Sequence, residues 1–218
     1  SPYNYCANNP VILVDPDGET PKIYIETTGI TGHAFITVGE GKNTVVYTYG
    51  RFLGGDKGKS SANSLDPSGK GVLIKLTGKE AQRYIRHQLK DNKAKAYEIT
   101  DASDQKVMEY FDKIFSQGRK LNSEEANFYN SKATKYGNSD DARVIDNYSL
   151  DMTTDGAKAG GTNEDFSNDI SGGLLTPNIQ KQPILTPSEL KEYLQIHTQY
   201  KNSNVKDVTK KMTQEFCD

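Results

Sequence analysis

Three short segments near the start of the chain constrain its fold more than any other feature of the sequence. They are residues 22–27, 33–38 and 44–49, each rich in β-branched or aromatic residues, with glycine-containing turns between them. Branched and aromatic side chains suit a pleated, half-buried surface, so these segments are typical of strands. The sequence therefore predicts an antiparallel meander, in which His33 starts the second strand and shares a face with Phe35.

Helical patterns follow the meander. Residues 79–90 and 104–117 repeat apolar side chains every three or four positions, and Ser103 or Asp101 is placed to cap the second helix. A threonine, a proline and a reciprocal glutamate at 186–189 predict another helix, reaching to about residue 200. With further strands expected at 72–76 and 96–100, the predicted fold class is α+β, an antiparallel sheet packed with helices.

The composition limits the classes of partner. The 218 residues suffice for one compact domain, and the net charge of −2 comes from 27 basic and 29 acidic residues spread along the chain. Nucleic-acid binding is therefore not expected. No apolar run approaches the roughly 18 residues of a membrane span, and the first residues lack the pattern of a secretory signal, so we expect no transmembrane segment and export that is specified elsewhere.

Motifs for cofactors and metals are absent from the sequence. It contains no glycine-rich phosphate loop, no His-Glu-x-x-His and no Cys-x-x-Cys, so neither a cofactor nor a metal is expected. The two cysteines, Cys6 and Cys217, stand at opposite ends of the chain and match no metal-ligand spacing, while a disulfide between them is left open.

Residues 1–18 carry the most specific motif. A Tyr-x-Tyr is followed by Asn-Asn-Pro and a closing Asp-Pro-x-Gly, supplied by Tyr3, Tyr5, Asn8, Asn9, Pro10, Asp15, Pro16 and Gly18. This string resembles the last segment of an Rhs (YD-repeat) core, where the repeat shell gives way to a variable toxin. Turns on either side of a buried strand at 11–14 explain the local shape of this segment, but they do not explain the whole set of matches. The resemblance divides the chain into the end of an Rhs core, 1–18, and an effector domain, 19–218.

The Rhs resemblance implies a biological setting. The domain would be a secreted antibacterial effector, delivered into the periplasm or cytoplasm of a target bacterial cell. Its implied partners are the Rhs shell, the secretion machinery and a cognate immunity protein that protects the producing cell.

A second resemblance concerns the order of two stretches, Thr-Gly-His-Ala-Phe-Ile-Thr-Val at 31–38 and Tyr-Ser-Leu-Asp-Met-Thr-Thr-Asp-Gly at 148–156. Together they resemble the circularly permuted papain-like (NlpC/P60-related) hydrolases, which cleave amide, peptide or acyl bonds. The resemblance implies His33 as the base and a nucleophile at the start of a short helix, where the free N–H groups lower a thiol's pKa.

The sequence departs from that family at the nucleophile. The position of the expected cysteine is Met152, and a thioether has no proton to lose and cannot accept an acyl group. We therefore predict a thiol-hydrolase fold that is catalytically inactive as written. Tyr47, Tyr49 and Thr153 are the residues expected to line a substrate cleft or to orient His33.

Structural roles compete with each of these assignments. His33 has the alternative role of a hydrogen-bonded strand histidine. Met152 has the alternative role of a core residue at a helix start, and Tyr47 and Tyr49 that of half-buried strand residues. His197 has the helical spacing of a packed residue. Cys217 is a secondary candidate for a nucleophile, although it follows a helix rather than beginning one.

Other classes of toxin are the alternative to a thiol hydrolase. An ADP-ribosyl transferase, a nuclease, or a toxin that acts by binding or by pore formation would each leave His33 with a structural role. The lack of a hydrophobic hairpin or span disfavours pores.

Overall fold

The computed structural model describes residues 19–27, 32–50, 71–132, 137–145, 152–162 and 187–218. Their strands form one eight-stranded antiparallel sheet in the order β6-β7-β4-β3-β2-β1-β5-β8. The predicted meander is confirmed as β1 (Lys22–Glu26), β2 (His33–Val38) and β3 (Val45–Gly50), which lie next to one another at the centre of the sheet. The fold is α+β, as the sequence predicted.

Five further strands extend the sheet on both sides of the meander. β4 (Val72–Leu76) pairs with β3, and β7 (Ala142–Val144) and β6 (Arg119–Lys120) follow it toward one edge. On the other side β5 (Lys95–Ile99) pairs with β1, and β8 (Val205–Asp207) forms the opposite edge. Both edge strands are short, which limits the unpaired backbone that the edges present.

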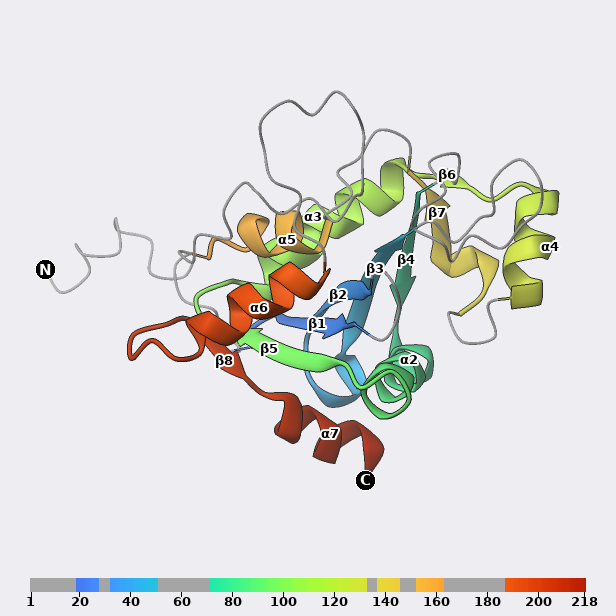
Figure 1. Ribbon diagram of the computed structural model, residues 1–218. Coiled ribbons are helices and arrows are strands. Elements are labelled where there is room, and N and C mark those ends of the chain that lie inside the picture. Colours follow the sequence, from blue (N-terminus) through green and yellow to red (C-terminus); the bar gives the residue numbers. More distant parts are fainter. Residues whose placement is uncertain (1–18, 28–31, 51–70, 133–136, 146–151, 163–186) are drawn as a thin grey trace, which may run out of the picture.

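Helices cover both faces of the sheet (Figure 1). One face carries α3 (Asp104–Gln117), α5 (Met152–Ala159) and α6 (Pro187–His197), whose apolar side chains pack with Ile36, Tyr47 and Leu73. The other carries α2 (Gly78–Lys90), α7 (Thr209–Cys217) and α4 (Ser123–Lys132), which pack with Phe35, Val46 and Ile74. We call these the α3 face and the α2 face.

Strand alternation assigns each side chain to one of the two faces. Successive residues of a strand point to opposite sides, so buried residues of β2 divide between two separate hydrophobic cores. Phe35 belongs to the core on the α2 face, where it stacks on Tyr24 with ring centroids 4.8 Å apart. Ile36 belongs to the core on the α3 face. This separation decides which functional side chains can meet.

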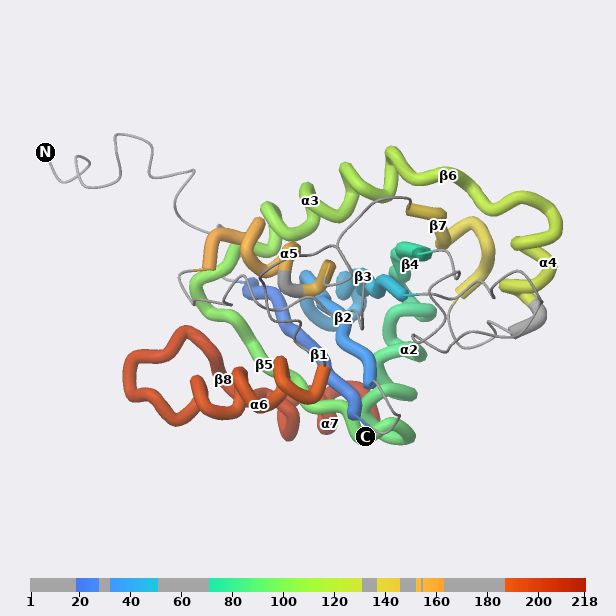
Figure 2. Tube along the Cα trace, turned by 45° about the horizontal axis from the view of Figure 1, so that its top comes forward, coloured from blue at the N-terminus to red at the C-terminus, as the bar shows by residue number. Residues whose placement is uncertain are grey.

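Local sequence signals account for the helix that borders the predicted site. α3 begins at its predicted position, because the Ser103 hydroxyl accepts a hydrogen bond from the backbone N–H of Lys106 (3.4 Å). Val107, Phe111 and Ile114 form its buried stripe. Figure 2 shows α3 running along one side of the sheet with α5 beside it.

Some predictions fall outside the described residues. The Rhs-like string at 1–18, which includes Cys6, belongs to this group.

Candidate functional site

The glycine of the Gly-His motif is required by the backbone. Gly32 has a φ of +66°, and a Cβ at this position would lie 2.5 Å from the carbonyl oxygen of Glu26 on the neighbouring strand and 3.0 Å from Cβ of Pro187. A side chain here would be strained and would collide with backbone. The turn into β2 thus explains the glycine without any catalytic role.

His33 follows this turn and directs its imidazole toward the α2 face. Its Nε2 lies 2.6 Å from Oγ1 of Thr48 on β3, and that hydroxyl lies 3.3 Å from the phenol oxygen of Tyr84 on α2. Thr48 and Tyr84 are each 1% exposed. His33 is therefore the outer member of a polar chain that leads into the core between the sheet and α2.

Burial makes His33 a weak base. The protein atoms packed around the ring withdraw it from water, although part of the residue's surface remains exposed, and this desolvation lowers the pKa of His33 to about 4. The carboxylate of Glu26, its cross-strand neighbour, opposes the shift but does not cancel it. A general base works best with a pKa near the operating pH, so this environment suits a neutral structural histidine better.

Met152 lies in the core on the α3 face. It is the first residue of α5, it is 1% exposed, and its core includes Ile36, Phe111 and Ala157. The Thr153 hydroxyl donates a hydrogen bond to the backbone carbonyl of Ala34, at 3.2 Å, and so holds the first turn of α5 on β2. The predicted short helix is confirmed, and it starts beside the predicted strand.

The predicted pair is nevertheless not assembled. The backbone neighbours are Ala34 and Thr153, but Ala34 and His33 point to opposite sides of β2. The sheet lies between the imidazole of His33 and the side chain of Met152. A thiol placed at position 152 would face the core that contains Ile36, whereas His33 faces Thr48.

The tyrosines expected in the cleft have structural contacts. Tyr47 is 1% exposed, and its phenol donates a hydrogen bond to Oδ1 of Asp112 (2.8 Å). The same oxygen accepts a hydrogen bond from Nζ of Lys75 (2.7 Å). Burial first, and then Asp112, raises the pKa of Tyr47 above its ordinary value. Tyr49 is partly buried against the same core. Tyr47 lies on the α3 face and cannot orient His33.

The glycines of α5 serve close helix packing. A Cβ on Gly156 would lie 2.2 Å from Cε2 of Phe111, and one on Gly160 would lie 2.8 Å from Cγ2 of Val107. The carbonyl of Gly160 also accepts a hydrogen bond from the backbone N–H of Ser103 (2.9 Å). The Asp-Gly-Ala-Lys-Ala-Gly-Gly stretch is thus explained by the contact between α5 and α3.

The remaining histidines and the described cysteine form no shared centre. His197 stacks on Tyr193 with ring centroids 4.1 Å apart, as its predicted packed role requires, and Nδ1 of His87 lies 2.6 Å from Oδ2 of Asp91. Cys217 ends α7 and is partly exposed. In the part of the chain that the structure describes, no group of three or more His, Cys, Asp or Glu residues could hold a metal ion.

A small, shallow crevice opens on the α2 face, beneath α7. Its charged and polar lining includes Lys22, Tyr24, Glu40 and Glu215. None of the residues predicted as catalytic or cleft-lining borders it. The helices described in the structure include none that is long and apolar enough to cross a membrane.

Comparisons with protein-family models, with curated proteins and with solved structures found no match for this chain.

Proposed function

We propose that this chain belongs to an Rhs-type polymorphic toxin and that residues 19–218 form an effector domain. The supporting observation is that the first strand of the sheet begins just after the Rhs-like string at 1–18. β1 begins at Lys22, four residues after Gly18, and is paired along both sides with β2 and β5. The sheet therefore needs no strand from residues 1–18 beside β1, which favours a unit that is separate from the preceding shell.

We further propose that the chain has no thiol-hydrolase activity as written. Met152 carries no ionisable proton, its side chain is buried, and the base implied by the permuted papain-like resemblance lies across the sheet. One observation still supports the resemblance: the start of α5 contacts β2 through the hydrogen bond from the Thr153 hydroxyl to the backbone carbonyl of Ala34. Contact between these segments does not by itself create a catalytic pair.

A growth assay tests both parts of the proposal. The full chain is expressed in bacteria, in the cytosol and separately with an export signal, and surviving colonies are counted. The variants are Met152→Cys, which adds a thiol, and Met152→Ala, which alters packing at the same position without one. Each is also made with His33→Ala.

The outcomes are distinct. Toxicity that is independent of position 152 supports an effector with other chemistry. Toxicity that appears only with Met152→Cys and disappears when His33→Ala is added would restore the thiol hydrolase with His33 as its base. Survival with every variant in both compartments would contradict the effector proposal.

A further inference from the structure

Helix α2 gathers basic residues that the chain as a whole does not reveal. Residues 77–95 contain six basic residues, Lys79, Arg83, Arg86, Lys90, Lys93 and Lys95, and two acidic ones, Glu80 and Asp91, within a chain of net charge −2. Four of the basic residues are spaced by four, three and four positions, so they share one side of α2. We call Lys79, Arg83, Arg86 and Lys90, with Lys93 just beyond them, the α2 row.

Among the residues that the structure describes, most of the α2 row has no carboxylate partner. Arg83 pairs with Glu80, and Asp91 is engaged by His87. Within the described ranges, no carboxylate oxygen lies within 4 Å of the charged groups of Lys79, Arg86, Lys90 or Lys93. All five residues of the row are exposed. Like charges three or four positions apart destabilise a helix, so folding alone does not account for this arrangement.

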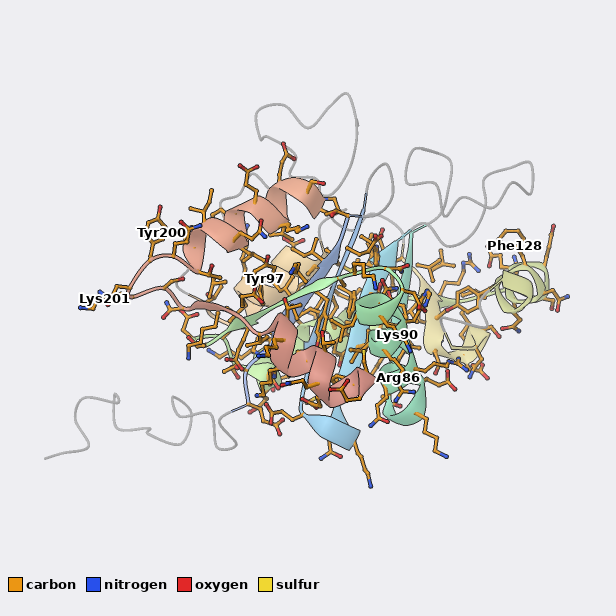
Figure 3. The ribbon with its side chains drawn as sticks, turned by 60° about the horizontal axis from the view of Figure 1, so that its bottom comes forward. Arg86, Lys90, Tyr97, Phe128, Tyr200 and Lys201 are labelled. Atoms are coloured by element: carbon orange, nitrogen blue, oxygen red, sulfur yellow. The ribbon has the colours of Figure 1, made fainter. Side chains whose placement is uncertain are left out.

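Two details position the row. Nε of Arg86 donates a hydrogen bond to the carbonyl oxygen of Phe216 near the end of α7 (2.6 Å), which holds the guanidinium in place although the residue is exposed. Lys93 has a φ of +55°, a conformation that favours glycine or asparagine, and it is the one described non-glycine residue with positive φ. Figure 3 shows Arg86 and Lys90 together at the α2 surface, away from the labelled aromatic residues Phe128 and Tyr200.

The chemistry of the row selects the kind of partner. Protein interfaces are depleted in lysine and centre on apolar or aromatic side chains, which the α2 row lacks. An anionic membrane is a plane of charge and would also meet the exposed carboxylates of Glu215 on neighbouring α7 and of Asp218 just after it. The phosphates along one strand of a duplex form a line of charge, which matches the linear arrangement of the row. Single strands are bound largely by stacking on aromatic side chains, but the row consists of lysine and arginine, and Tyr84 of α2 is buried.

We propose that the α2 row binds the phosphate backbone of a nucleic-acid duplex without reading its sequence. Lys79 to Lys90 spans about 16 Å along the helix axis, from a rise of 1.5 Å per residue. One strand of a duplex carries a phosphate every ~3.4 Å of its axis, so the row faces about five phosphates. The inference rests on this surface alone and does not depend on the toxin proposal.

The test is fluorescence anisotropy of a labelled 20-base-pair DNA duplex, titrated with the full chain between 50 and 200 mM salt. The row variant is Arg86→Gln with Lys90→Gln. The matched control is Lys106→Gln with Lys201→Gln, which removes the same charge from exposed positions on other surfaces. We expect the row variant to bind at least about tenfold more weakly and to flatten the slope of log K against log salt by about 1.8, as two lost phosphate contacts require.

A second variant separates binding from folding. Lys93→Gly removes a cation but relieves the positive φ, so it is expected to weaken duplex binding while leaving the melting temperature unchanged or higher. Equal losses in the row variant and the control would overturn the proposal. So would preferential binding to anionic vesicles or to polyglutamate at the same salt, or no duplex binding at 50 mM salt.

Discussion

The imidazole of His33 and the side chain of Met152 lie on opposite faces of the sheet, although the backbone segments that carry them touch. His33 approaches Oγ1 of Thr48 on the α2 face, whereas Met152 belongs to the core on the α3 face. The segments meet through Thr153 and Ala34, one residue after each. A histidine one residue further along β2, at the position of Ala34, would lie on the same face as Met152. A difference of one residue in position therefore separates a catalytic arrangement from the structural one observed here.

The lowered pKa of His33 predicts a pH-dependent stability. Unfolding restores the ordinary pKa of 6.5, so the unfolded chain binds more protons than the folded one between about pH 4 and 6.5. The contribution of His33 is present above pH 6.5 and is lost as the pH falls toward 4; with its partial exposure we expect on the order of 2 kcal/mol. Urea unfolding at pH 4.5 and 7.5 measures it.

The control for this prediction is His33→Gln, which keeps a hydrogen-bonding side chain without a titrating ring. The difference in free energy of unfolding between the two pH values should be smaller in the variant. An unchanged difference would mean that His33 is not the group responsible.

The contact between Tyr47 and Asp112 predicts a structural, non-catalytic role for both. Asp112→Asn weakens the ion pair with Lys75 and the hydrogen bond from Tyr47, and we expect a loss of about 1 kcal/mol in the free energy of unfolding, because Asp112 and Lys75 are partly exposed. Tyr47→Phe should lower the free energy of unfolding of the Asp112→Asn variant by less than it lowers that of the unchanged protein. A double-mutant cycle with no coupling would show that the contact contributes nothing.

The matched control for the Asp112 measurement is Glu109→Gln on the exposed side of α3, where the carboxylate accepts a hydrogen bond from Gln105 on the same helix. Its effect on stability should be within about 0.5 kcal/mol, the usual range for surface substitutions.

The close approach of α5 to α3 predicts that Gly156→Ala is destabilising. The added methyl would overlap the ring of Phe111, and such overpacking costs about 1–3 kcal/mol. Phe111→Leu alone should also destabilise the core, but combined with Gly156→Ala it should lose less than the sum of the two. Additive losses, measured by urea unfolding, would contradict the packing between these residues.

The fold was predictable where local patterns determine the structure. The strands 33–38 and 72–76 and the helix 104–117 have the bounds expected from side-chain alternation, helical periodicity and the cap at Ser103. β6 and β8 were not expected, because strands of two and three residues carry no period of their own and form only where a neighbouring strand offers a partner.

The candidate site was predictable only in part. Alternation along 33–38 already placed His33 and Ala34 on different faces, but the face covered by the helix at 152 depends on long-range packing between Gly156 and Phe111. The α2 row was not predictable from the composition, for a different reason. The net charge of the whole chain is close to zero and gives no sign of a local basic surface. The basic residues form a row only because positions 79, 83, 86 and 90 lie on one side of a helix.

The most direct test of the two-face arrangement is the reactivity of a thiol introduced by Met152→Cys, in a chain that also carries Cys6→Ser. Its alkylation rate is measured against pH by peptide mass spectrometry, with the partly exposed Cys217 as an internal reference. We expect the buried thiol to react at least about tenfold more slowly than Cys217, and His33→Ala to leave its pKa unchanged within about 0.3 units. A fast-reacting thiol whose pKa rises by more than about one unit with His33→Ala would place the imidazole beside position 152 and contradict the account.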